Sequence, residues 1–148
     1  MAFTLPAAYQ HEPLTKRSKL DQTEMQHTSI SMVYISHAAN VLILIAVCTA
    51  MWRADAGMEI AFGPDSPARR ILACVYFAIL LASLYALIRA GFGAPQIAVQ
   101  IAMVLFPFQI TYKLATAFAV GIDNPVVVTN LAVVALHTVT LIVMLRST

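Results

Sequence analysis

Charged residues are scarce in this sequence: Asp, Glu, Lys and Arg together make up only 11% of its 148 residues. A soluble domain usually carries about a quarter charged residues. Hydrophobic residues make up 60% of the chain, and the mean hydropathy is +0.80. This composition argues against a soluble globular domain and favours an integral membrane protein.

Cysteine is also scarce, and the familiar catalytic motifs are missing. The two cysteines, Cys48 and Cys74, are too few for a disulfide framework or a four-cysteine metal site. The sequence contains no CxxC, HExxH, GxSxG, Walker or dinucleotide-binding motif. A net charge of +2 is too small to indicate nucleic-acid binding. The sequence therefore indicates no particular reaction and no metal site.

The hydrophobic residues gather in four blocks, at about residues 32–52, 68–88, 96–120 and 126–145. A helix needs about 20 apolar residues to cross the roughly 30 Å hydrocarbon core of a bilayer. The blocks therefore predict an all-α integral membrane protein, in which residues 32–148 form a four-transmembrane-helix bundle. Residues 1–31 form a polar N-terminal tail that lacks the apolar core of a signal peptide, so we expect the first block to be an uncleaved anchor.

Three of the four blocks begin with residues that favour helix starts. Pro67, Pro95 and Pro125 each stand at the beginning of a block, where the N–H that proline lacks would be unpaired anyway. Ser66 and Asn124 directly precede two of these prolines and are good N-cap residues. The turns before the last two blocks are short, so we expect the last three helices to be antiparallel neighbours.

Four spans place both chain termini on the same side of the membrane. Basic residues favour that side by five to three, and the positive-inside rule then predicts cytoplasmic termini. The five are Lys16, Arg17, Lys19, Arg89 and Arg146, and the three are Arg53, Arg69 and Arg70. We expect the protein to lie in a bacterial inner membrane, in contact with membrane lipids.

Two segments lie outside the predicted spans. The loop at 53–67 is the longest connection, and we expect its residues 58–62 to lie along the membrane surface. The tail at 1–31 has little apolar surface to bury, so alone it should be disordered, and a neighbouring subunit would have to order it. Small size, the missing catalytic motifs and this tail favour a non-catalytic accessory or structural subunit of a larger bacterial inner-membrane complex, of the respiratory or photosynthetic type.

Polar residues inside the first and last spans are the first candidates for a site. His37 and Asn40 lie in the first span, and Asn130 and His137 lie two helical turns apart in the last. Hydrogen bonding between helices is the favoured interpretation, since polar side chains commonly join membrane helices. The alternative is a membrane enzyme or haem protein, with His37 and His137 as axial ligands of haem b or as a proton relay. The expected depths fit haem poorly, because His37 is predicted near the tail side of its span and His137 near the middle.

The third span is the most polar, and its polar residues are predicted to form two sides. One side carries Gln96, Gln100, Met103 and Pro107, and the other carries Gln109, Tyr112, Lys113 and Thr116. Proline inside a helix removes a backbone hydrogen bond and favours a kink, which would shape a pocket. The candidate ligand-binding residues are Gln100, Gln109, Tyr112 and Lys113. They motivate a second functional hypothesis, a module that binds or transports a small molecule such as a quinone or a lipid.

Lys113 is the one charged side chain placed well inside a predicted span. Its long stem would let the ammonium reach the interface near Gly121 or contact Asp123 in the following turn. A partner subunit or a lipid phosphate is the alternative partner. The spans contain no acidic residue, which argues against an ion-coupled transporter, because such transporters usually need a titratable carboxylate there.

The arrangement of four spans between about 32 and 145 resembles that of small bacterial four-helix membrane proteins of the DoxX-like kind. The resemblance rests on the arrangement of the spans. The stretches at 62–70 and 109–113 are distinctive features of this chain. No functional residue follows from the resemblance.

Overall fold

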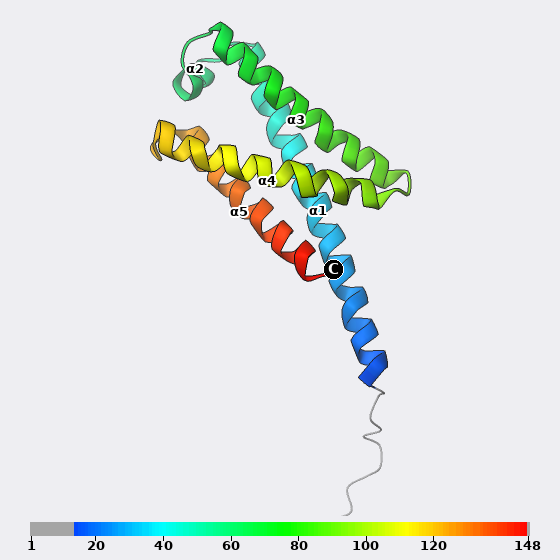
Figure 1. Ribbon diagram of the computed structural model, residues 1–148. Coiled ribbons are helices and arrows are strands. Elements are labelled where there is room, and N and C mark those ends of the chain that lie inside the picture. Colours follow the sequence, from blue (N-terminus) through cyan, green and yellow to red (C-terminus); the bar gives the residue numbers. More distant parts are fainter. Residues whose placement is uncertain (1–13, 148) are drawn as a thin grey trace, which may run out of the picture.

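The computed structural model of the protein describes the backbone of residues 14–147 and the side chains from Asp21 onward. Within this range the chain forms five helices and no strand: α1 (Leu14–Trp52), α2 (Ala56–Phe62), α3 (Pro67–Gly91), α4 (Pro95–Val120) and α5 (Pro125–Arg146) (Figure 1). Helices α1, α3, α4 and α5 are long and apolar enough to cross a membrane. The prediction of an all-α integral membrane protein with a four-helix bundle is confirmed.

The predicted helix starts match the observed ones closely. Helices α3, α4 and α5 each begin with proline. The Ser66 hydroxyl accepts a hydrogen bond from the backbone N–H of Arg69 over 3.2 Å. The Asn124 side chain accepts one from the N–H of Val126 over 2.9 Å. Both caps satisfy backbone donors that a helix start leaves unpaired.

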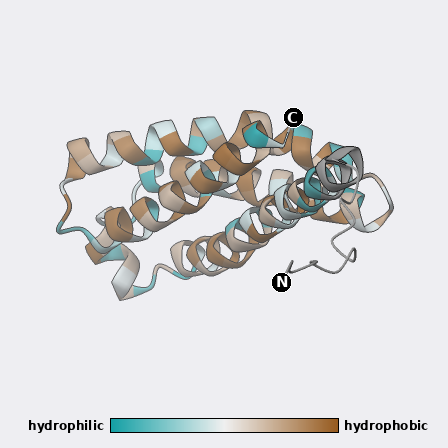
Figure 2. Cartoon of the chain, turned by 90° about the horizontal axis from the view of Figure 1, so that it is seen from below, coloured by the Kyte–Doolittle hydropathy of each residue, from teal (hydrophilic) through white to brown (hydrophobic). Residues whose placement is uncertain are grey.

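The four long helices pack around a narrow interior. Helix α1 contacts α3, α4 and α5, and the pairs α3–α4 and α4–α5 are also in contact. The buried residues of α1 follow one face of the helix: Ser29, Val33, Ser36, His37, Asn40, Leu44, Cys48 and Met51. Large apolar side chains such as Phe108 and Phe118 point outward, and hydrophobic residues run along all four helices in Figure 2. This outer surface is suited to contact with lipid.

Helix α1 begins at Leu14 rather than near the predicted start at Met32. An isolated tail of this composition is expected to lack structure, yet residues 14–31 are helical. Two physical reasons explain the difference: the segment contains no Gly or Pro, and extending an existing helix costs less than nucleating one. The remainder of the predicted tail, residues 1–13, lies outside the described residues.

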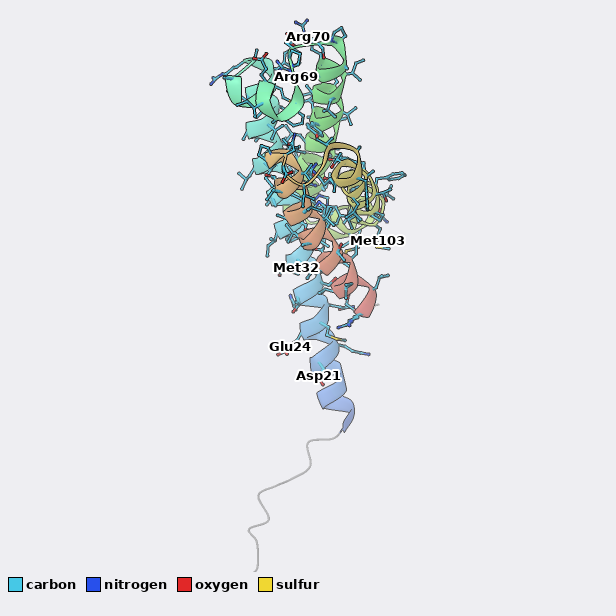
Figure 3. The ribbon with its side chains drawn as sticks, turned by 90° about the vertical axis from the view of Figure 1, so that its left-hand side faces the viewer. Asp21, Glu24, Met32, Arg69, Arg70 and Met103 are labelled. Atoms are coloured by element: carbon cyan, nitrogen blue, oxygen red, sulfur yellow. The ribbon has the colours of Figure 1, made fainter. Side chains whose placement is uncertain are left out.

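The N-terminal part of α1 projects beyond the rest of the bundle (Figure 1). Its 39 residues give α1 a length of about 58 Å at ~1.5 Å per residue, which is well beyond the roughly 30 Å of a hydrocarbon core. All side chains from Asp21 to Thr28 are exposed. Figure 3 shows Asp21 and Glu24 on this extension and Arg69 and Arg70 at the opposite end of the molecule.

The segment predicted along the membrane surface forms the short helix α2. Met58 and Phe62 of α2 are half-buried against the cluster of side chains around Tyr76, whereas Ile60 is exposed. The side-chain amide of Asn124 donates a hydrogen bond to the carbonyl of Ala61 over 3.0 Å, which joins α2 to the start of α5. Helix α2 therefore covers one end of the bundle.

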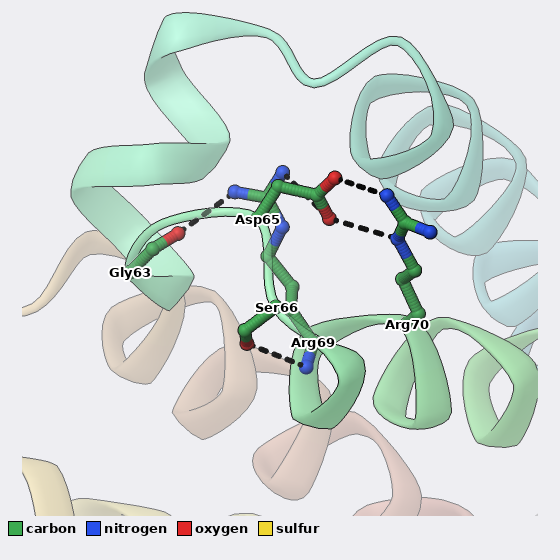
Figure 4. Close-up of polar contacts among 5 residues, drawn as sticks. All are labelled: Gly63, Asp65, Ser66, Arg69 and Arg70. Atoms are coloured by element: carbon green, nitrogen blue, oxygen red, sulfur yellow. Dashed lines mark hydrogen bonds and ion pairs between the residues drawn. The ribbon is translucent and has the colours of Figure 1, made fainter.

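The connection from α2 to α3 is held by two arginines (Figure 4). The buried Arg69 donates from Nη1 to the carbonyl of Gly63 over 2.7 Å. Arg70 donates twice to the Asp65 carboxylate, from Nε over 3.2 Å and from Nη2 over 2.7 Å. Gly63 has φ +79°, a conformation that a residue with a side chain adopts only with strain. These contacts hold the α2–α3 connection against the start of α3.

The Asp65→Asn variant is expected to lower the melting temperature slightly at neutral pH. The hydrogen-bonded Arg70 guanidinium lowers the pKa of the Asp65 carboxyl. A lowered folded-state pKa contributes stability above the ordinary aspartate pKa of about 3.9, and this contribution is lost as the pH falls through the folded-state value. Thermal unfolding of both proteins in detergent should therefore differ at pH 7 and converge in acid. The exposed Asp123→Asn serves as the control, and an equal effect of both variants at pH 7 would contradict the assignment.

Candidate functional site

Most of the buried and half-buried polar side chains inside the bundle form two clusters. The histidine cluster consists of Ser36, His37, Asn40, Ser83, His137 and Thr140. The lysine cluster consists of Gln109, Tyr112, Lys113, Thr116 and Asn130. Every residue of the histidine cluster belongs to α1, α3 or α5, whereas the lysine cluster joins α4 to α5.

Asn40 is the centre of the histidine cluster. Its amide nitrogen donates to the Ser83 hydroxyl over 3.1 Å. Its amide oxygen lies 3.3 Å from Nε2 of His137. An amide oxygen only accepts, so Nε2 of His137 carries the proton. One side chain of α1 thereby joins α3 and α5.

His37 is fixed by a backbone carbonyl of α4. Its Nε2 lies 3.1 Å from the carbonyl oxygen of Ala98, so this nitrogen also carries a proton. The hydroxyls of Ser36 and Thr140 lie 2.7 Å apart and form a further bond between α1 and α5. Nδ1 of His37 and Nδ1 of His137 have no hydrogen-bond partner among the described residues.

Phe106 of α4 lies between the two histidines. Its ring stacks on His137 with a centroid distance of 4.1 Å and an interplanar angle of 5°. The centroid of the His37 ring lies 4.9 Å from that of Phe106, at 49°. The two histidines therefore lie on the same ring, close to one another in the fold. The fully buried Phe106 ring fills the space between the imidazoles, and this arrangement does not support a haem b between them.

The lysine cluster is built on a hydrogen-bonded triangle. Nζ of Lys113 donates to Oδ1 of Asn130 over 2.8 Å. Nδ2 of Asn130 donates to the Thr116 hydroxyl over 3.2 Å. That hydroxyl in turn donates to the backbone carbonyl of Lys113 over 2.6 Å. The side chains of α4 and α5 are thus joined near the end of the bundle that α2 covers.

Lys113 points into the bundle rather than toward the interface. The residue is only 5% exposed, so the predicted extension of its side chain toward Gly121 or Asp123 is wrong. Asn130 explains the difference, because it offers an acceptor inside the protein at the same depth. The Tyr112 ring lies on another side of the ammonium, with its centroid 5.0 Å from Nζ.

The lysine cluster contains further unpaired polar groups. The Tyr112 hydroxyl and both polar atoms of the Gln109 amide have no hydrogen-bond partner within the described side chains. Gln109 is 1% exposed, so water does not replace the missing partners from outside. Buried polar groups are usually paired, and such exceptions often mark a functional site.

Two neighbouring cavities open beside the lysine cluster, under α2. The first has a volume of about 260 Å³ and is lined by Lys113 and Asn130 together with apolar residues of α1, α2 and α5. The second has a volume of about 440 Å³ and is lined by Tyr112, Thr116 and Asn130 together with residues of α2 and α3. The residues that line both cavities are Ala61, Phe62, Tyr76, Val126 and Asn130. The rings of Phe62 and Tyr76 meet edge to face, with centroids 6.1 Å apart.

The structure brings together three of the four predicted ligand-binding residues. Gln109, Tyr112 and Lys113 face the interior, whereas Gln100 is exposed on the other side of α4 beside Val104 and Phe108. All four predicted interhelical residues, His37, Asn40, Asn130 and His137, are buried and form hydrogen bonds to other helices. Cys48 is buried and Cys74 is exposed, and both are free thiols.

Sequence reasoning missed the pairing of Asn130 with Lys113, the position of Phe106 between the histidines and the contribution of α2 to the cavity walls. Lys113 lies eight positions before Gly121, and Asn130 lies six after Asn124, so their similar depth was a signal that could have paired them. Phe106 carried no signal, because a lone aromatic residue in an apolar span is indistinguishable from any other.

No protein family, curated protein or solved structure matches the chain.

Proposed function

We propose that this membrane protein binds a small lipophilic molecule, of the quinone or lipid class, in the cavities under α2. The observation that carries the proposal is the buried Lys113 at the wall of a cavity that is otherwise mainly apolar. Ligand sites are usually concave and mostly apolar, with a few polar groups that orient the ligand. Lys113, Asn130 and Tyr112 supply those groups here.

The position of the cavities also supports a ligand that comes from the membrane. Their walls contain residues of α2, the one short helix among the described elements, whose side chains are all exposed or half-buried. A segment with few buried contacts opens at lower free-energy cost than the core of a bundle. Helix α2 is therefore the element whose displacement would admit a ligand.

The Ala61→Phe variant tests this proposal. Ala61 lines both cavities, so a phenyl ring at this position should fill the space and displace a ligand. We expect the wild-type protein, gently extracted from membranes, to retain a lipophilic molecule that extraction and mass spectrometry identify. The variant should retain at least about tenfold less of this molecule, which corresponds to a loss of about 1.4 kcal/mol in binding free energy.

The matched control for Ala61→Phe is Ala119→Phe. Ala119 is exposed near the end of α4 and lines neither cavity. The Ala119→Phe variant should leave the amount of retained molecule unchanged. Equal retention by the wild type and both variants would overturn the proposal.

A second candidate function is an accessory or structural subunit of a larger bacterial inner-membrane complex, with cytoplasmic termini. The observation that favours it is the α1 extension, which projects from the bundle with every side chain from Asp21 to Thr28 exposed (Figure 1). The described part of the chain buries none of these side chains, so a partner subunit packed against the extension would stabilise it. Native mass measurement after mild solubilisation should then find a species heavier than 16.1 kDa, with another protein in it. A single chain of that mass would contradict this candidate.

A further inference from the structure

The lysine cluster has more hydrogen-bond donors than acceptors. A lysine ammonium carries three N–H donors and accepts none. Among the described residues, one of the three donates to Asn130, and the Asn130 amide nitrogen itself donates to the Thr116 hydroxyl. The Tyr112 hydroxyl has no partner within the same residues. The Gln109 amide oxygen is an unpaired acceptor, but Gln109 lines neither cavity. Acceptors for the donors at the cavity walls would therefore have to come from a ligand.

The lysine cluster also lacks a negative charge. Among the described side chains, none of the buried ones is Asp or Glu. Asp65 is bound to Arg70 in the α2–α3 connection, and Asp123 is exposed. The Tyr112 ring near Nζ stabilises a cation by only about 0.5–2 kcal/mol. A buried charge needs a partner of opposite sign, and the fold itself provides none in the described part.

The lining of the first cavity suits an apolar chain. Beyond Lys113, part of its wall is aliphatic, with Ile43, Leu44 and Val47 of α1 and Val126 of α5, and residues of α2 and Tyr76 supply much of the rest. Its volume of about 260 Å³ lies just below the roughly 300–1,000 Å³ usual for ligand sites. Lys113 lies eight residues inside the end of α4 at Gly121, or about 12 Å along the helix, so the polar head must enter the bundle.

We propose that the ligand of this site is a single-chain amphiphile with a carboxylate head, which binds Lys113 while its chain lies along the aliphatic wall. The inference rests on the proposed function and narrows it to one chemical class. A carboxylate supplies the missing charge and accepts hydrogen bonds from the ammonium. A quinone supplies acceptors but leaves the ammonium without a counter-charge.

The test compares three ligands of equal chain length and different head groups with a quinone. The full-length protein in nanodiscs of phosphatidylcholine is titrated with decanoate, decanol, decylamine and a short-chain quinone, and binding is measured by native mass spectrometry. Decanoate should bind at least about tenfold more tightly than decanol, and decylamine more weakly than both. This comparison needs no variant, so it does not depend on the folding of a mutant.

Variants then assign the preference to Lys113. Lys113→Met should remove the preference for decanoate over decanol, whereas Arg89→Met, which removes one exposed positive charge from the far end of α3, should keep it. A preference for decanol or for the quinone over decanoate would overturn the inference and leave the proposed function intact. Failure of all four probes to bind would overturn both. A preference for decanoate that survives in a folded Lys113→Met protein would overturn the role of Lys113.

Discussion

Replacing Phe106 by alanine is expected to lower the free energy of unfolding by about 3 kcal/mol, in the range of large-to-small substitutions at buried aromatic residues. The Phe106 ring is fully buried and contacts both His37 and His137. Lipid removes most of the hydrophobic driving force between helices, so the loss comes from dispersion contacts and from the cavity that the ring leaves. The contacts of α4 with α1 and α5 should weaken together.

Phe108 provides the matched control for this prediction. It lies two residues further along α4 and is 71% exposed on the outer surface, so Phe108→Ala removes the same atoms from a lipid-facing position. Unfolding of both variants in mixed micelles with increasing denaturing detergent should show a large loss for Phe106→Ala and a loss below about 1 kcal/mol for Phe108→Ala. Equal losses would mean that the ring between the histidines has no special structural role.

The membrane-spanning architecture was predictable because it depends on local properties of the sequence. The length of an apolar block and a proline at its start act within one helix, and Pro67, Pro95 and Pro125 mark the observed first residues of α3, α4 and α5. The start of α1 was not predictable in this way. Hydropathy reports where a helix enters lipid, and a polar segment such as 14–31 can continue the same helix into water.

The candidate site was predictable only in part, because helical spacing is a local property of the sequence and the packing between helices is not. Helical spacing alone places Gln109, Tyr112 and Lys113 on one side of α4, and the structure has them there. The contact of Lys113 with Asn130 depends on how α4 packs against α5, which no local pattern specifies. Cavities under α2 depend on the packing of five helices, so the sequence could not show them.

Replacing Asn130 by leucine is expected to lower the free energy of unfolding of the ligand-free protein by about 2–3 kcal/mol. Asn130 supplies the side-chain acceptor for the Lys113 ammonium, and hydrogen bonds to charged groups contribute about 1.5–3 kcal/mol. The variant also leaves the Lys113 donors unpaired inside the bundle, where no acidic side chain is buried among the described residues.

The double variant Asn130→Leu with Lys113→Met separates the energy of the contact between the two side chains from the cost of leaving one of them unpaired. Methionine has nearly the length of lysine without its charge, so it removes the unpaired donor that Asn130→Leu creates. Replacing a buried polar pair by apolar residues of similar size is often neutral. The double variant should therefore be more stable than Asn130→Leu alone, with a coupling energy of at least about 1 kcal/mol in the cycle. Additive effects of the two substitutions would show that the 2.8 Å contact between Nζ and Oδ1 contributes nothing to stability, and Lys113 would then need another partner in the folded protein.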